Sequence, residues 1–87
     1  MTTELSILQT IIADWLTAEL EYESKDFRFE IPANGPVDWL YDLYVRFDEP
    51  CLLYSDDCAE EYQQFRIMLD EHGHECEFLD SRWMGIN

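Results

Sequence analysis

Apolar residues near the start of the chain recur at intervals of three and four. The stripe consists of Leu5, Leu8, Ile12, Trp15, Leu16 and Leu20, and Ile7 and Ile11 widen it. This spacing predicts an amphipathic helix over residues 3–20, with one face packed against an apolar surface. Thr3 can cap the helix, and Glu4 suits the positive end of its dipole.

The pattern changes to alternation in the next segment, LEYESKDFRFEI, residues 20–31. Its apolar positions switch parity near Lys25-Asp26, which predicts a bulge, a bend or two short strands. Asn34-Gly35 then signals a turn, and Pro36 can begin a short helix over PVDWLYD, residues 36–42.

Alternation returns at Leu43, Val45 and Phe47, and a second apolar run covers residues 51–55. Asp48-Glu49-Pro50 lies between the two runs and has the composition of a turn. The two runs therefore predict a β-hairpin over residues 43–55.

Residues 59–71 fit two patterns. Tyr62, Phe65 and Leu69 have helical spacing, whereas Phe65, Ile67 and Leu69 have strand spacing. The good helix formers in this segment favour a helix on local propensity. His72-Gly73 can either end a helix or turn a hairpin. The segment ECEFLDS that follows is a strand, which we expect to be the final one, in both cases.

Composition indicates that these elements form one small folded domain. The chain has 87 residues, of which 47% are hydrophobic and 15% aromatic, more apolar material than disordered acidic tails carry. We expect a single α+β domain over residues 1–87, with an N-terminal helix, a short second helix and a mainly antiparallel sheet.

The net charge of the chain limits the kinds of partner that the protein can bind. Twenty acidic residues face five basic ones, giving a formal net charge of −15, and the acids are spread along the chain. Such a protein repels nucleic acid and membrane surfaces and is attracted to basic ones. Because many basic surfaces bind nucleic acid, an acidic protein can occupy such a surface in its place. The alternative explanation is solubility alone, or a halophilic source.

Residues suited to catalysis or metal binding form no recognisable set. His72, His74 and Cys76 alternate as zinc ligands in a strand could, but their spacing matches no established motif. No third group orients a Cys/His nucleophile pair, and three glycines provide no phosphate loop. We therefore expect no enzymatic activity, cofactor or metal. The odd count of three cysteines and the absence of a signal segment predict a reducing cytoplasm with free thiols.

The order of motifs resembles the phage uracil-DNA glycosylase inhibitors, which are small acidic DNA mimics. Glu23-Ser24 follows the first helix in LEYES, as in the family's first strand, and LLYSDDCAEEY is similar to the family's Leu-Leu-x-Ser-Asp and later Glu-Tyr pair. FRIMLDEHGHECEFL occupies the place of the family's closing hairpin. That resemblance implies a strand over residues 63–70, and we follow it here against the local propensity.

The resemblance also implies a mechanism, in which carboxylates take phosphate positions in the enzyme's DNA groove and an apolar pocket receives one of its side chains. The implied partner-binding residues are Glu23, Ser24, Asp38, Asp42, Asp56, Asp57, Glu60 and Glu61. The implied pocket residues are Leu40, Val45, Leu53 and Met68. The expected partner is uracil-DNA glycosylase, in the host cytoplasm if the protein is phage-encoded. The alternatives are an anti-CRISPR or anti-restriction DNA mimic, or another acidic protein-binding module.

Overall fold

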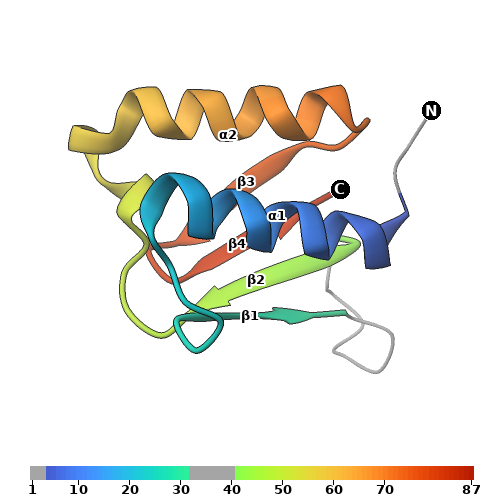
Figure 1. Cartoon of the computed structure of the whole chain (residues 1–87), viewed down its shortest axis with the longest axis horizontal. Coiled ribbons are helices and arrows are strands. Elements are labelled where there is room, and N and C mark those ends of the chain that lie inside the picture. Colours follow the sequence, from blue (N-terminus) through green and yellow to red (C-terminus); the bar gives the residue numbers. More distant parts are fainter. Residues whose placement is uncertain (1–3, 32–40) are drawn as a thin grey trace.

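The fold has two layers, two helices on one face of an antiparallel sheet (Figure 1). The computed structural model describes residues 4–31 and 41–87. The helices are α1, Leu5–Leu20, and α2, Ala59–Glu71. This arrangement confirms the α+β class with a long N-terminal helix.

The sheet has four strands in the order β1-β2-β4-β3, and each neighbouring pair is antiparallel. The strands are β1, Phe27–Glu30; β2, Leu43–Phe47; β3, Cys76–Asp80; and β4, Trp83–Ile86. The last strand along the chain therefore lies inside the sheet, between β2 and β3.

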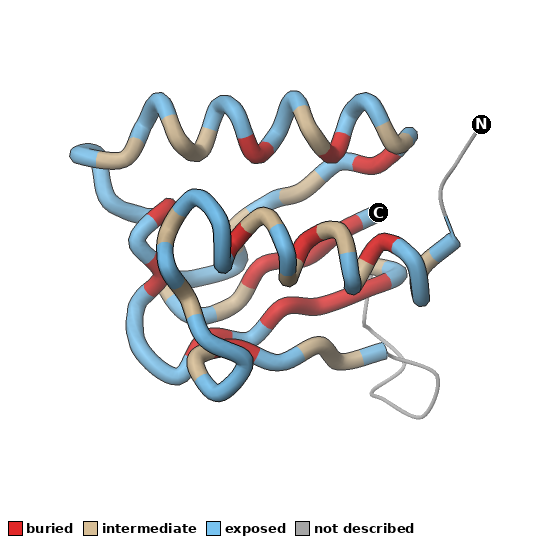
Figure 2. Tube along the Cα trace, in the orientation of Figure 1, coloured by how far each residue is buried: buried red, intermediate tan, exposed pale blue. Residues whose placement is uncertain are grey.

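The core lies between the helices and the sheet (Figure 2). Strand alternation directs Leu43, Val45 and Phe47 of β2, together with Met84 and Ile86 of β4, toward the helices. From the helix side, α1 contributes Leu8, Ile12 and Leu16, and α2 contributes Phe65 and Leu69. Where the helices meet, the rings of Trp15 and Phe65 lie 5.0 Å apart between centroids.

The opposite face of the sheet carries a close aromatic contact over Gly85. A Cβ atom at this position would lie 2.5 Å from Cγ of Tyr41, so a larger residue would collide with the ring. The Tyr41 hydroxyl donates a hydrogen bond to the carboxylate of Glu77 on β3. This contact explains why a strand interior contains glycine.

The strand predicted over residues 63–70 is wrong, because this segment forms α2. Its helical spacing places Phe65 and Leu69 on the buried side, whereas Ile67, at strand spacing from both, is half-exposed. The left-handed Gly73, with φ of 78°, ends the helix and turns no hairpin. The closing hairpin instead joins β3 to β4, so ECEFLDS is not the final strand.

The hairpin predicted over residues 43–55 is also wrong in its second half. Leu52–Tyr54 and Asp56–Cys58 form two 3₁₀ turns, named η2 and η3. Both sides of β2 are already paired, with β1 and with β4, so no position remains for a hairpin partner.

Two other predictions concern the edges of the described segments. The parity change near Lys25-Asp26 is a turn before β1. The short helix predicted over residues 36–42 falls mainly outside the described residues, and its last two, Tyr41 and Asp42, are not helical.

Candidate protein-binding site

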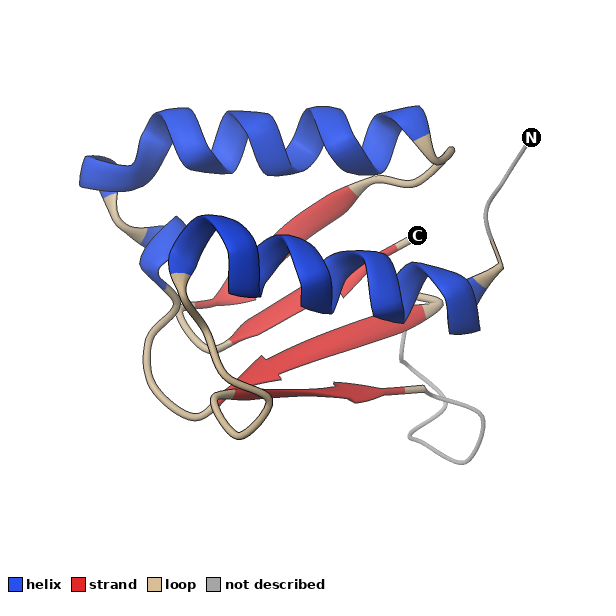
Figure 3. Ribbon diagram, in the orientation of Figure 1, coloured by secondary structure: helices blue, strands red, loops and turns tan. Residues whose placement is uncertain are grey.

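Three connections meet at one end of the molecule: the segment after α1, the segment from β2 to α2, and the β3–β4 turn (Figure 3). Main-chain hydrogen bonds join them. The Asp48 amide donates to the oxygen of Asp26 at 3.0 Å, and the Cys51 amide donates to the oxygen of Ser81 at 2.7 Å. These bonds hold the loops as one surface attached to the sheet.

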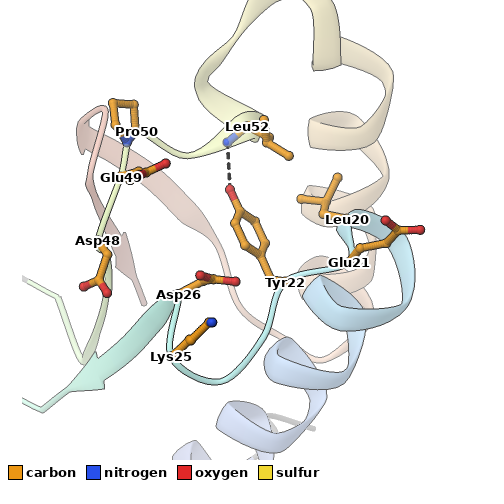
Figure 4. Close-up of a pocket in the computed structure, with 9 residues that line it drawn as sticks. All are labelled: Leu20, Glu21, Tyr22, Lys25, Asp26, Asp48, Glu49, Pro50 and Leu52. Atoms are coloured by element: carbon orange, nitrogen blue, oxygen red, sulfur yellow. Dashed lines mark hydrogen bonds between the residues drawn. The ribbon is translucent and has the colours of Figure 1, made fainter.

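An open cleft of about 580 Å³ lies between the first two connections (Figure 4). Its lining residues are Leu20, Glu21, Tyr22, Lys25, Asp26, Asp48, Glu49, Pro50 and Leu52. Four of these carry carboxylates, and Lys25 is the one cation lining the cleft within the described chain. We call this the acidic cleft.

Tyr22 ties the walls of the acidic cleft together. Its hydroxyl accepts a hydrogen bond from the Leu52 amide at 3.0 Å (Figure 4). Its ring lies 6.2 Å from that of Phe27 and 5.8 Å from that of Phe47, between centroids. Burial raises the pKa of Tyr22 from its ordinary value of 10.0 to about 12, which keeps the hydroxyl neutral even at moderately alkaline pH. The apolar ring and neutral hydroxyl therefore form part of a fixed wall.

The turn beside the cleft is fixed by its own carboxylates. Glu21 has a left-handed backbone, with φ of 60°, which ends α1 and redirects the chain. Asp26 accepts a hydrogen bond from the Glu23 amide at 2.8 Å, and the Glu23 carboxylate lies 3.2 Å from the Lys25 ammonium. That surface ion pair reduces the positive charge available to the four cleft carboxylates, which favours a cation from outside.

A second acidic group lies where η3 joins α2. The Ser55 hydroxyl accepts a hydrogen bond from the Asp57 amide at 3.2 Å, which caps η3. Asp56 and Asp57 are exposed there, and Glu60 and Glu61 occupy the first turn of α2, where the helix dipole stabilises negative charge. The structure thus brings together four of the predicted partner-binding residues.

The other predicted partner-binding residues are divided. Glu23 and Ser24 are exposed in the turn beside the acidic cleft, not in a strand. Asp42 precedes β2, at the opposite end of that strand from Asp48, and its amide donates to the Ile86 oxygen at 3.0 Å. Asp38 lies outside the described residues.

The predicted apolar pocket is not open. Val45 and Leu53 are core residues, with 0% and 2% of their surface exposed, and the half-buried Met68 packs against that core. They are enclosed because β2 and η2 both face the helices. Leu40 lies outside the described residues.

Several lining residues of the acidic cleft were not predicted from the sequence, notably Tyr22, Asp26, Asp48 and Glu49. The sequence did mark residues 48–50 as a turn. No local signal placed that turn against residues 20–26, because the contact is made only when β1 pairs with β2.

The histidines lie away from this end of the molecule. His74 is buried, and its Nδ1 lies 3.0 Å from the main-chain oxygen of Asn87. Among residues 4–31 and 41–87, no group of three or more His, Cys, Asp or Glu side chains is arranged to hold a metal ion. In the same residues, no helix is long and apolar enough to cross a membrane.

Comparisons with known proteins identify no relative of this chain. No protein-family model matches the chain, and no curated protein or solved structure is significantly similar to it.

Proposed function

We propose that this protein is an acidic DNA mimic, which binds a basic nucleic-acid-binding surface of another protein and excludes nucleic acid from it. The observation that carries the proposal is the acidic cleft, in which carboxylates from two separate connections surround an apolar wall. The second acidic group, on η3 and α2, lies further along the segment from β2 to α2 that also forms one side of the cleft.

The physical basis is charge combined with a fixed frame. A net charge of −15 draws the protein toward a basic surface and raises the association rate, especially at low salt. Carboxylates held by hydrogen-bonded loops lose little conformational freedom on binding. Leu20, Pro50 and Leu52 add apolar contact that salt does not screen.

Uracil-DNA glycosylase is the first target we propose to test. The resemblance that suggested it implied a strand over residues 63–70, and this segment forms part of α2. The acidic residues Glu23, Asp56 and Asp57 remain exposed and compatible with a phosphate-mimicking role. A restriction or CRISPR nuclease complex is the alternative target. The compartment we propose is a reducing cytoplasm, with Cys51, Cys58 and Cys76 as free thiols.

The test is uracil excision from a labelled oligonucleotide with increasing amounts of this protein, in low and in physiological salt. In parallel, a fluorescent DNA duplex is displaced from a panel of basic DNA-binding proteins that includes nuclease complexes. Inhibition of excision supports the glycosylase target. Displacement from another panel member supports the wider proposal, and no displacement from any of them contradicts it.

Matched variants distinguish the contribution of the acidic cleft to binding from the contribution of net charge. Asp48→Asn/Glu49→Gln and Glu4→Gln/Asp14→Asn remove the same charge, but the second pair lies at the N-cap and in the middle of α1, and neither residue lines the cleft. We expect the cleft pair to weaken displacement about tenfold or more, as for interfacial charges, and the α1 pair to change it less than threefold. Equal effects of the two pairs would show that net charge alone causes the binding.

A further inference from the structure

A row of three aromatic rings runs beside the edge strand β3. Tyr54 of η2 packs against Phe78 of β3 at 5.2 Å between ring centroids, and Phe78 packs against Tyr62 of α2 at 5.3 Å. Three different elements, η2, α2 and β3, thus contribute one ring each. We call these residues the aromatic row.

The aromatic row is accessible from solvent. Tyr54 is 54% exposed, and Phe78 and Tyr62 are partly exposed. The row ends beside a groove of about 380 Å³ that Tyr62 lines together with Glu75 and Glu77. At its other end, Asp56 and Asp57 follow Tyr54 along the chain after one intervening residue, Ser55. Carboxylates therefore lie near both ends of the row.

The row already holds one guanidinium group. The Arg66 side chain lies over the Tyr62 ring, with its Cζ atom 5.9 Å from the ring centroid. No carboxylate within the described residues forms an ion pair with it at 4.0 Å or less. Tyr62 therefore accepts a cation over its face, which is the chemistry that an arginine from another protein requires.

We propose that the aromatic row is a docking site for arginine side chains of the basic partner, an inference that rests on the proposed function. Arginine is favoured over lysine because its planar guanidinium stacks on aromatic rings while its N–H groups reach neighbouring carboxylates. The exposed Tyr54 ring receives the stacked guanidinium, and the carboxylates of Asp56 and Asp57 accept its hydrogen bonds. We expect the occupant to be an arginine-bearing segment of the partner, because its positive charge complements the carboxylates beside the row.

The 3₁₀ turn η2 connects this site to the acidic cleft. Leu52 lines the cleft, Leu53 enters the core, and Tyr54 begins the aromatic row. A partner that places one basic side chain in the cleft beside Leu52 can thus place a second one at Tyr54, two residues further along this protein's chain.

The experiment uses octa-arginine and octa-lysine peptides as probes, with affinity measured by calorimetry in physiological salt. Amide chemical shifts map the contact. We expect octa-arginine to bind several-fold more tightly and to shift residues of η2, η3 and β3. Tyr54→Ala should weaken octa-arginine about fivefold, within the range of a cation–π contact, and Tyr54→Phe should restore it.

Ile67→Ala is the matched control, because Ile67 is 50% exposed on α2 and is not part of the row. We expect less than a twofold change. Equal losses for Tyr54→Ala and Ile67→Ala, equal affinity for the two peptides, or no octa-arginine binding would overturn the docking site.

The DNA-displacement assay distinguishes this inference from the proposed function. If Tyr54→Ala displaces DNA as well as the unmodified protein does, the docking site is wrong and the DNA-mimic proposal stands. If octa-arginine binds at the row but no panel member releases DNA, the DNA-mimic proposal is wrong and the row is an arginine site for another purpose.

Discussion

The two helices lie on the same face of one sheet but depend on different interactions. α1 buries Leu8, Ile12 and Leu16 completely along its 16 residues. α2 buries Phe65 and Leu69 along 13 residues, and carboxylates occupy both of its ends. Glu60 and Glu61 suit the positive end of the dipole, whereas the last turn has no basic residue to suit the negative end.

The two helices therefore contribute differently: α1 contributes mainly to the buried core, and α2 contributes much of the charged and aromatic surface. α1 is specified by an apolar stripe that leaves little freedom in its sequence. α2 needs few anchors, so most of its surface can carry charge and aromatic contacts. The helix with fewer buried residues is the one that contributes Tyr62 to the aromatic row and Glu60 and Glu61 to the second acidic group.

The largest expected effect is at the anchor of α2. Phe65→Ala should lower the free energy of unfolding by about 3–5 kcal/mol, because it removes a buried ring that also contacts Trp15. Urea denaturation measures this. Hydrogen exchange should show earlier loss of protection in α2 than in α1.

The control for this prediction is Ile67→Ala, at an exposed position on the opposite side of α2 from Phe65 and Leu69, which should stay within about 0.5 kcal/mol. A loss below about 1 kcal/mol for Phe65→Ala would show that this ring is not the anchor of α2, and equal loss of protection in both helices would show that the two helices are equally stable.

Alkaline pH should affect α2 through its contact with β3. Burial raises the pKa of Tyr62 to about 12 and that of Cys76 to about 11, above their ordinary values of 10.0 and 9.0. The folded state therefore holds both groups protonated more tightly than the unfolded chain does. The resulting stability is fully present below about pH 9 and is lost as pH rises from 9 to 12.

Denaturation at pH 8, 10 and 11 tests this dependence, with tyrosinate absorbance to follow the hydroxyls. Cys76→Ala should reduce the fall in stability between pH 9 and 10, and Cys58→Ala serves as the matched cysteine control. Unchanged stability up to pH 11 would argue against tight burial of the Tyr62–Cys76 contact.

The smallest expected effect comes from the helix dipole. Asp70→Lys should stabilise the protein by about 0.3–1 kcal/mol, because it places a cation at the end of α2 that lacks one. Glu60→Lys changes net charge equally but places the cation in the first turn. The midpoint temperature of thermal unfolding should therefore be higher for Asp70→Lys than for Glu60→Lys. If the two variants have equal midpoints, net charge outweighs the dipole.

Periodicity predicted the elements that bury a continuous apolar face. α1 and β2 were predicted because their buried residues recur regularly. α2 was favoured by local propensity, and the family resemblance replaced that correct interpretation with a strand. β4 was not predicted, because Gly85 weakens its strand pattern. The reason for that glycine, the Tyr41 ring, is visible only in three dimensions.

The candidate site was predicted in composition rather than in geometry. The family resemblance implied that Glu23, Asp56 and Asp57 are partner-binding carboxylates, and all three are exposed. The sequence could not show that Tyr22 reaches the Leu52 amide, a contact across 30 positions of the chain. Val45 and Leu53 were expected to line an opening, but apolar residues at strand and turn positions have no sequence mark that separates an open pocket from a core.

The internal position of β4 has a consequence for the order of folding. β4 pairs with β2 across roughly forty residues of chain, as between Val45 and Met84, and with β3 across a tight turn. Long-range pairing of this kind is entropically costly and slow to nucleate, so local units should form earlier. Until residues 83–86 dock, β2 and β3 have no common neighbour and the sheet remains in two halves. The β3–β4 turn therefore joins the other two connections, through the Cys51–Ser81 hydrogen bond, only in the last step of assembly.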